Sequence, residues 1–468
     1  MYRFTKEQVL DPAFLTRLIG RFKNEQIPRF AKDERYYRVK TQILERTMTD
    51  GKPNNKLAHG FCRYITNMAT SYFAGKPIRY LFDPKDEDME QEAEAYKDAV
   101  TAVFKDNYID SLNFEVSKEA SKKGIGFYLI FSNEFSKLRI KKLDAETVIP
   151  VYSPSLDEFL ETAVRIWSEY DIEGTLLCEY ADVYDDTHIH HFRRMSGEFF
   201  YAEYRVPEPH YLGDIPVIIV WNNEEQLGDY EPVITLNDAY DNAQSDTAND
   251  MDYFTDAYLC ITGASSMVED ALAGDGSGED EDDGSTAVRN LRKNRILFLD
   301  ENGQAQWLTK NVNDAVNENY KDRLYKDIFF LSQVPALTDE SFSGNLSGIA
   351  IKYKMTGLEE LAIMKENRMR SAQTKMLRII TDFLNTKMNK HWDPDMIEQK
   401  YDRNFVENVS DVITDVRNLD GIISRETQLD MLPLSVVSDT SSELDRQRQE
   451  SLDAEGLPKV DLDSIDRM

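Results

Sequence analysis

Apolar residues recur mostly three and four positions apart between residues 347 and 389, the spacing that lines one face of an α-helix. They are Leu358, Leu361, Ala362, Met369, Ala372, Met376, Ile379, Ile380 and Phe383. The segment contains no proline and is predicted to form one long helix of roughly 60 Å. A bend is expected at Gly357, because a glycine inside a helix costs about 1 kcal/mol. A helix this long usually connects separate parts of a large structure, although an ordinary amphipathic helix would show the same pattern.

Two narrower apolar stripes predict a pair of helices at residues 231–257 and 311–332. The stripes are Leu236, Tyr240, Ala243, Thr247, Met251, Phe254 and Tyr258, and then Val312, Val316, Tyr320, Leu324, Ile328 and Leu331. Polar residues, including Asp238, Asp241 and Asn249, flank the first stripe. This pattern favours helices that pack side by side with one surface in water. Two strand-like segments, YLCITG and RILFLD, lie between the predicted helices.

The remaining pattern mixes helices and strands. Helices are predicted after a turn at Asn54 and Asn55, and again at about 87–106 and 114–123. Alternating apolar and polar residues predict a hairpin with its turn at Ser132 and a run of strands over residues 147–222. Residues 333–347 are a loop by composition, and the C-terminal residues predict short helices and a tail. The fold class is therefore α+β and mainly helical.

Composition limits what this chain can bind. The 468 residues exceed one compact core, and 41% of them are hydrophobic. The 55 basic against 85 acidic residues give a net charge of −30, which argues against a surface that grips nucleic acid. The three cysteines include no CxxC pair, so they indicate neither a disulfide framework nor a zinc site. No signal peptide or membrane-spanning segment is predicted.

Acidic residues concentrate between residues 265 and 292, where no Lys or Arg precedes Arg289. Such a run repels itself and predicts a solvated loop. A calcium loop is the alternative. An EF-hand needs glycine at its sixth position and glutamate at its twelfth, and a loop counted from Asp275 has Asp280 and Thr286 there.

The sequence motifs that could indicate nucleotide, phosphate or metal binding are weak. The strings at Gly51 and Gly75 place proline where a Walker loop needs its magnesium-binding hydroxyl, which excludes a packaging ATPase. Gly124 and Gly126 precede a predicted strand rather than a helix, so a phosphate loop is disfavoured. The histidines in HIHH could share a strand face, but a metal site would need further ligands that are not evident nearby.

Several stretches, taken together in order, resemble the portal, or head-to-tail connector, proteins of tailed double-stranded-DNA bacteriophages with long non-contractile tails, the siphophage type. The stretches cover most of residues 36–434. They are PNNKLAHGFCRYITNMATSYFAGKPIRY, GFYLIFSNEFSKLRIKKLDAETVIPVY, IPVIIVWNNEEQLGDYEPVITLNDAYDNAQSDTANDMDYFTDAYLCITG, SGIAIKYKMTGLEELA and LDGIISRETQLDMLP. The long acidic insert around Glu279 to Asp283 departs from the family pattern.

The resemblance implies a homo-oligomeric ring, usually of twelve subunits, at one capsid vertex of the virion. Double-stranded DNA would enter through it during packaging and leave during ejection, without sequence specificity and without catalytic residues, metal or cofactors. The terminase motor, scaffold and major capsid proteins, and head-completion and tail proteins would be its partners, with assembly in the host cytoplasm and no membrane.

The resemblance also divides the chain into wing, stem, clip and crown. The expected parts are the wing with N-terminal helices and a β-rich part (1–230), a stem helix (231–257), the clip with its acidic loop (258–310), a second stem helix (311–332), a tunnel loop (333–347), the long wing helix (348–390), and the crown with the C-terminal tail (391–468).

Two sets of residues are candidates for function. Polarity and position before the long helix place a tunnel loop nearest to DNA, at Asp339, Glu340, Ser343, Asn345 and Ser347. The docking of motor and connector is expected at Glu279, Asp280, Glu281, Asp282 and Asp283. A carboxylate-rich lining would repel phosphates and let DNA slide, since each neutralised phosphate adds affinity.

Two other functions stay open at this point. A metal-dependent nuclease needs only a few carboxylates brought together in space, and the chain has many. A non-viral oligomeric scaffold could use the same helices.

Overall fold

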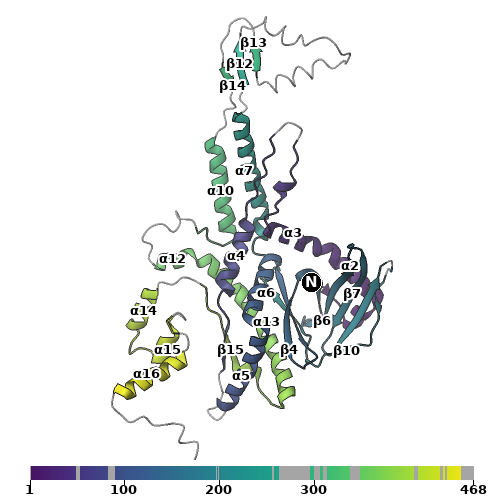
Figure 1. The fold of residues 1–468 in the computed structure, drawn as a ribbon, viewed down its shortest axis with the longest axis vertical. Helices are drawn as coiled ribbons and strands as arrows, with labels where there is room; N and C mark the ends of the chain where they lie inside the picture. Colours follow the sequence, from purple (N-terminus) through teal and green to yellow (C-terminus); the bar gives the residue numbers. More distant parts are fainter. Residues whose placement is uncertain are drawn as a thin grey trace, which may run out of the picture. The chain divides into compact units, whose positions relative to one another are not determined.

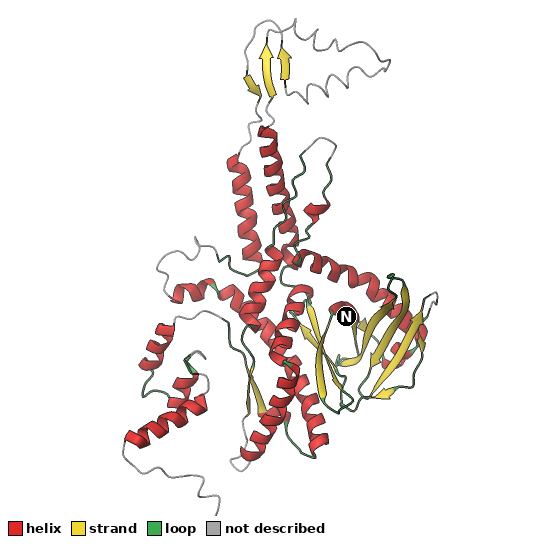
Figure 2. Cartoon of the chain, in the orientation of Figure 1, coloured by secondary structure: helices red, strands yellow, loops and turns green. Residues whose placement is uncertain are grey.

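A computed structural model describes residues 2–48, 53–82, 90–196, 198, 200–255, 258–262, 296–299, 306–308, 314–337, 348–404, 409–432, 436–437 and 440–454. The chain divides into two compact units, drawn in Figures 1 and 2. The first mixes α and β structure, and the elements described in the second are helices. The first unit comprises residues 1–336 and 355–403, and the second comprises residues 337–354 and 404–468. Each unit is described by itself.

The first unit contains helices and strands along its whole length. Its helices are α1 (Lys6–Leu10), α2 (Pro12–Glu25), α3 (Ile27–Tyr37), α4 (Phe61–Ala74), α5 (Glu90–Asn107), α6 (Ile109–Lys123), α7 (Ile234–Thr255), α10 (Asp314–Leu331) and α13 (Thr356–Met388). Its strands are β1 (Tyr2–Arg3), β2 (Arg79–Phe82), β3 (Ile125–Ser132), β4 (Leu138–Leu143), β5 (Val148–Tyr152), β6 (Leu160–Tyr170), β7 (Leu176–Tyr184), β8 (His188–Met195), β9 (Ala202–Glu203), β10 (Glu208–Pro209), β11 (Val217–Trp221), β12 (Tyr258–Thr262), β13 (Ile296–Leu299), β14 (Gln306–Leu308) and β15 (Ile397–Lys400).

A seven-stranded sheet forms the β-rich part that the alternating pattern predicts. Its strands follow the order β1-β5-β6-β7-β8-β10, with β9 also paired to β8. Helix α2 begins cleanly because Asp11 accepts a hydrogen bond from the Phe14 N–H and Pro12 occupies the first turn. The buried residues Leu15 and Phe22 of α2 belong to the same hydrophobic core as the sheet, so α2 covers one face of the sheet.

The second sheet, in the order β11-β3-β4, shares a core with the long helix α13. The predicted apolar residues of α13 are buried or half-buried, and Met376, Ile379 and Ile380 are fully buried. Each such side chain contributes about 1.5–3 kcal/mol to folding. The predicted core face of this helix is therefore confirmed.

The prediction of one continuous helix is wrong. Helix α12 (Gly348–Lys354) ends and α13 begins on either side of Met355, two residues before the predicted bend at Gly357. A Cβ atom at Gly357 would lie 3.0 Å from the Gln333 carbonyl oxygen. Glycine is needed here because the end of the segment after α10 passes close to the start of α13.

A packing role, rather than a phosphate, accounts for the glycines before β3. Gly124 ends α6 with φ +80°, and a Cβ there would lie 2.2 Å from the Gln226 carbonyl oxygen. A Cβ on Gly126 would lie 2.7 Å from the Val116 carbonyl oxygen. Both glycines are required because other backbone segments approach them closely.

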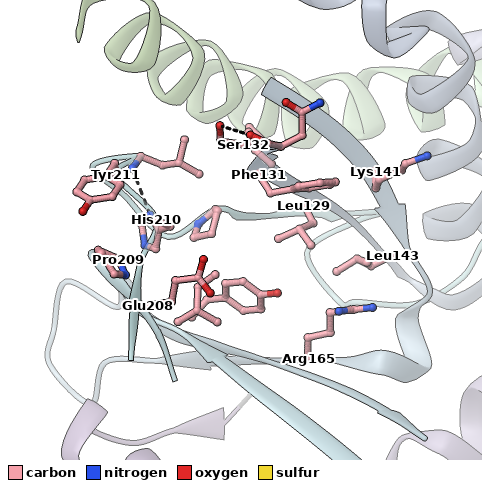
Figure 3. A pocket seen from close by; sticks show the side chains of 16 residues that line it. Leu129, Phe131, Ser132, Lys141, Leu143, Arg165, Glu208, Pro209, His210 and Tyr211 are labelled. Carbon is pink, nitrogen blue, oxygen red and sulfur yellow. Dashed lines mark hydrogen bonds between the residues drawn. The ribbon is translucent and has the colours of Figure 1, made fainter. Parts of the chain in front are cut away.

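A cleft of about 610 Å³ lies between the two sheets (Figure 3). Its walls combine apolar and charged side chains, among them Leu129, Lys141, Leu143, Arg165, Tyr184 and Glu208.

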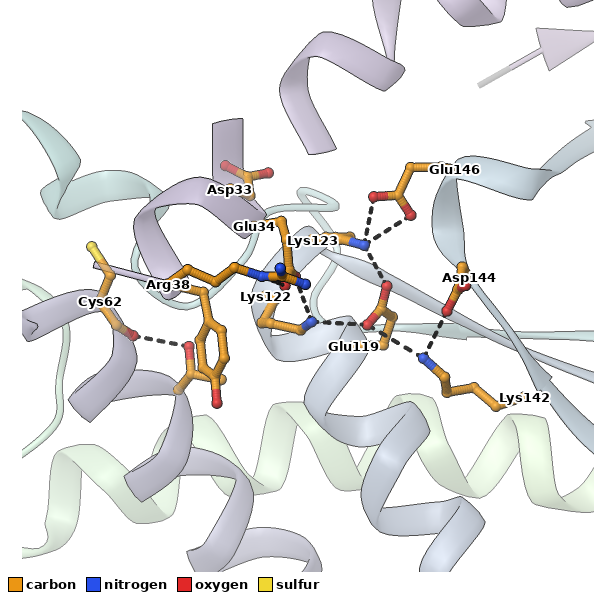
Figure 4. A network of polar contacts seen from close by, with 12 residues as sticks. Asp33, Glu34, Arg38, Cys62, Glu119, Lys122, Lys123, Lys142, Asp144 and Glu146 are labelled. Carbon is orange, nitrogen blue, oxygen red and sulfur yellow. Dashed lines mark hydrogen bonds and ion pairs between the residues drawn. The ribbon is translucent and has the colours of Figure 1, made fainter. Parts of the chain in front are cut away.

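Buried charges join α3, α6 and β4 in a network of ion pairs (Figure 4). Glu119 accepts from Lys123 Nζ at 2.6 Å and from Lys122 Nζ at 3.1 Å, and Lys142 Nζ lies 3.6 Å away. Burial alone would raise the pKa of Glu119, but the three ammonium groups outweigh it and lower the pKa to about 2. Glu119 therefore stays ionised and holds the three lysines together.

Most of the shorter predicted elements are found, with shifted ends. Helix α4 begins at Phe61 rather than directly after Asn54 and Asn55, and it ends at Gly75 as predicted. The hairpin turn after Ser132 is confirmed. In the second unit, Ser424 caps α15 (Arg425–Asp430), while α14 (Val409–Asn418) precedes it. Helix α16 (Thr440–Ala454) packs on α15, where Arg425 donates to Gln447 at 3.2 Å.

Candidate channel-forming elements

Helices α7 and α10 pack side by side in the first unit (Figure 1), within the two ranges predicted for helices. On α10, Leu324 and Ile328 are buried, whereas Val316 and Tyr320 are more than half exposed. On α7, Met251 is 64% exposed. The apolar stripes are thus only partly covered within one chain, which leaves apolar side chains exposed.

The most buried face of α7 is polar, contrary to the prediction that its polar residues lie in water. Asn237, Asp241, Ser245 and Asn249 are spaced four residues apart on one face, and all are buried. The apolar residues of the predicted stripe are only partly buried along the described part of the helix.

This polar face of α7 binds the segment that leads into α4. Residues 53–60 have no helix or strand of their own, so their backbone N–H groups need other partners. The N–H of Leu57 donates to Ser245 Oγ at 2.9 Å, and that of Asn55 donates to Asn249 Oδ1 at 2.7 Å. The side chains of α7 therefore supply the hydrogen-bond acceptors that a neighbouring strand would otherwise provide.

Asp241 is the centre of this contact. Its carboxylate accepts from the His59 N–H at 2.9 Å, from the Thr41 hydroxyl at 2.5 Å and from the Asn237 amide at 3.1 Å. The ring Nδ1 of His59 also lies 2.7 Å from it.

Replacing Asp241 should loosen this segment selectively. In Asp241→Ala, buried donors lose their acceptor, so the free energy of unfolding should fall by about 2–4 kcal/mol. Hydrogen exchange in residues 53–60 should accelerate more than in the sheets. Asn242→Ala, on the exposed side of the same turn, is the control and should change neither quantity appreciably. Equal exchange in the two variants would show that Asp241 does not hold the segment.

An aromatic cluster fixes the α7–α10 pair to α4. The ring of Phe61 meets Tyr240 of α7 at 5.1 Å, and Tyr325 and Phe329 of α10 at 6.0 and 5.9 Å. Tyr64 adds an edge contact with Phe329. One helix end thereby positions both members of the pair.

A buried ion pair fixes the segment before α7 to α13. Lys365 Nζ lies 2.8 Å from both carboxylate oxygens of Asp229, and it also donates to Asn222. Ser121 of α6 donates to the same carboxylate through its hydroxyl. Helices α6 and α13 therefore meet the loop between β11 and α7 at one charged, desolvated contact, which ties the long helix to the segment that leads into α7.

Beyond the α7–α10 pair, the segment between the two helices contains a small sheet. Strand β12 pairs with β13 in parallel and with β14 antiparallel. The two strands predicted here are confirmed, and β14 was not predicted.

The residues predicted to carry function lie outside the described residues. This applies to the tunnel-loop set Asp339, Glu340, Ser343, Asn345 and Ser347, and to the docking set Glu279, Asp280, Glu281, Asp282 and Asp283. The contact that sequence reasoning missed is the buried polar face of α7. Its signal is the spacing of four residues between Asn237, Asp241, Ser245 and Asn249.

The histidines of β8 are engaged by carboxylates. His190 Nε2 lies 3.1 Å from Asp185, and His191 Nδ1 lies 2.7 Å from Asp182. Across the parts of the chain that the structure describes, no three His, Cys, Asp or Glu side chains are placed to hold a metal ion. In the same parts, every helix is too short or too polar to cross a bilayer.

Comparison with known proteins gives a consistent result. The family model described as "Phage portal protein, SPP1 Gp6-like" matches residues 20–456. The portal protein of Bacillus phage SPP1 is 25% identical over 470 residues, which cover 94% of this chain and 86% of that protein. The portal protein of Clostridium phage phiCD119 is 20% identical over 398 residues, covering 80% and 82%. The chain belongs to the SPP1 Gp6-like family of phage portal proteins.

Proposed function

We propose that the chain assembles into a ring-shaped channel at one capsid vertex of the virion, through which double-stranded DNA enters during packaging and leaves during ejection. The family match over residues 20–456 carries this proposal. Uncovered apolar residues on the α7–α10 pair support it, since Val316, Tyr320 and Met251 would be buried between neighbouring subunits. Each subunit would present different surfaces to its two neighbours, and rotation would close the ring. Twelve copies are the proposed number.

In this proposal the observed elements take distinct roles. Helices α7 and α10 form the stem, the segment between them with β12–β14 forms the clip, and α13 is the spine of the wing. Residues 391–468 would form the crown and tail. Wing and stem are then joined by two contacts: the buried pair of Lys365 with Asp229 and the aromatic cluster around Phe61. Through these contacts, a movement of the wing would be transmitted to the stem, and a movement of the stem to the wing.

The surfaces for partners are proposed from the resemblance to portal proteins. The clip, with Glu279 to Asp283, would dock the terminase motor and later the head-completion and tail proteins. Scaffold and major capsid proteins would contact the ring from outside, and assembly would take place in the host cytoplasm. This chain would need no enzymatic activity, because the terminase motor would supply the energy that moves the DNA.

The tunnel loop is proposed at residues 333–347, with Asp339, Glu340, Ser343, Asn345 and Ser347 nearest to DNA. A net charge of −30 on each subunit repels phosphates and limits friction.

Deleting residues 341–345 should slow packaging without preventing ring assembly. We expect packaging by rings of the deletion variant, measured as DNase-protected DNA in the presence of the motor, to fall at least tenfold. Rings that lack these residues and still package at the full rate would contradict the tunnel-loop assignment. The wild-type ring and a variant with the same five residues replaced by a Gly/Ser linker of equal length separate the loss of length from the loss of side chains.

A further inference from the structure

One face of the seven-stranded sheet carries an unusual group of side chains. The group, here called the arginine–aromatic surface, consists of Arg165, Trp167, Tyr180, Arg193, Tyr204 and Arg205. Trp167 on β6 lies opposite Tyr180 on β7, which lies opposite Arg193 on β8. Residues directly opposite each other on paired strands share a face. This face is opposite to the one that α2 covers, because Ile166 and Ala181, the neighbours of Trp167 and Tyr180, belong to the core.

The side chains of this surface are packed against one another. The rings of Trp167 and Tyr180 stack at 5.1 Å with an interplanar angle of 14°, and the Arg165 guanidinium lies 4.5 Å from the Trp167 ring. The guanidinium groups of Arg193 and Arg205 lie 5.1 and 5.3 Å from the Tyr204 ring. Cation–π contacts of this kind hold the guanidinium groups in place before any partner binds.

The carboxylates on this face are engaged by other groups: Glu169 accepts from the Tyr180 hydroxyl at 3.0 Å, and Glu208 lies 3.6 Å from His191 Nε2. Asp182 is buried, is bonded to His191, and lies 3.9 Å from Arg165. Within the described residues, neither Arg193 nor Arg205 forms an ion pair with a carboxylate, and both are exposed. The cleft of Figure 3 continues this face past Arg165. Two fixed, exposed cations on a half-buried aromatic base are the composition of a protein-interface hot spot.

We propose that the arginine–aromatic surface docks a carboxylate-rich surface of a second copy of this chain. The argument is charge complementarity: each copy has 85 acidic against 55 basic residues, so a neighbouring copy presents mainly negative surface. Arginine matches carboxylates with two parallel N–H donors, which fixes orientation as well as charge. Stacking of nucleic-acid bases is less favoured, because Trp167 and Tyr180 already cover each other. This inference rests on the proposed ring assembly.

Charge reversal tests the contact. The variant Arg193→Glu/Arg205→Glu should raise the subunit concentration needed for half-assembly at least tenfold at low salt, and the difference from wild type should shrink as salt screens the charges. Lys97→Glu/Lys105→Glu on α5 changes the net charge equally at exposed positions and is the control, which should assemble like wild type. Circular dichroism of both variants verifies folding.

Crosslinking identifies the occupant. Arg193→Lys/Arg205→Lys keeps the charge and allows carbodiimide to join the introduced amines to carboxylates within reach. In assemblies mixed from isotopically light and heavy chains, we expect crosslinks from these positions to Asp or Glu of a second copy. Crosslinks that form only within one chain, or reversal variants that assemble like wild type, overturn the inference. So does a reversal variant that assembles normally but has lost affinity for a fluorescent single-stranded oligonucleotide. Wild-type chains that do not assemble would instead refute the proposed ring.

Discussion

Replacing Lys365 by methionine should lower the free energy of unfolding by about 3–5 kcal/mol, because the change leaves the carboxylate of Asp229 buried without its cation. Both side chains are almost completely buried, at 7% and 1% exposed. The same contact joins α13 to the segment before α7, so the loss should also accelerate hydrogen exchange at the start of α7. Denaturant unfolding followed by circular dichroism measures the first effect.

The chain offers a matched control on the same helix. Lys375 pairs with Asp214 at 3.2 Å, but these side chains are 28% and 50% exposed. Lys375→Met should therefore cost less than about 1 kcal/mol. The double variant Lys365→Met/Asp229→Leu removes both buried charges and should recover part of the loss. If the two single lysine variants lose the same stability, the buried contact has no special role.

Asp33→Asn should stabilise the protein above pH 7 and have little effect near pH 4. Asp33 is 1% exposed, and its Oδ2 has no hydrogen-bond partner within the described residues. Burial, followed by the negative charge of Glu231, raises the pKa of Asp33 to about 7. Ionising this group in the folded state is therefore costly at neutral pH.

The sign of the pH dependence follows from linkage. A carboxyl with a folded pKa of about 7 and an ordinary value of 3.8 contributes its full stability below 3.8 and loses it as the pH rises to 7. The asparagine side chain of the variant does not ionise, so the advantage of the variant should grow over that window to about 2–4 kcal/mol and stay constant above it. Asp157→Asn at an exposed position is the control. A stability difference that does not change between pH 4 and pH 8 would contradict this account.

Glu119 acts in the opposite direction. Because its folded pKa of about 2 lies below the ordinary value of 4.5, its contribution is present above pH 4.5 and is lost as the pH falls toward 2. The two carboxyls, both near α3 and α6 in Figure 4, therefore have opposite pH dependences in different ranges: Asp33 between pH 3.8 and about 7, and Glu119 between pH 4.5 and about 2.

The parts of the fold that sequence predicts well are those where one face is apolar. The core face of α13 and the alternating strands of the seven-stranded sheet follow directly from residue spacing. Beside the interruption at Met355, Gly357 is approached by Gln333, which lies more than twenty residues earlier, and periodicity contains no such information. Likewise, residues of α7 such as Asp241 and Asn249 are polar by composition but buried, because a distant segment needs hydrogen-bond acceptors for its backbone.

In the candidate site too, the helices could be predicted from the sequence, but the contacts between distant residues could not. The two helices expected to line a channel were located from their stripes, and family resemblance supplied their role. The contacts that position them could not be predicted, since the pairing of Lys365 with Asp229 and of Phe61 with Tyr240 joins residues more than a hundred positions apart. The arginine–aromatic surface was missed for a related reason: Arg165, Tyr180 and Arg193 come together only when three strands pair in one register.

The central claim is that this chain forms a closed ring around a hole, and the mass of the purified assembly, combined with negative-stain images of the same sample, tests it most directly. The account predicts one particle of about 650 kDa, twelve chains of 54.1 kDa each, with a central hole wide enough for duplex DNA. A chain that remains monomeric at high concentration, or an assembly without a central hole, would contradict it.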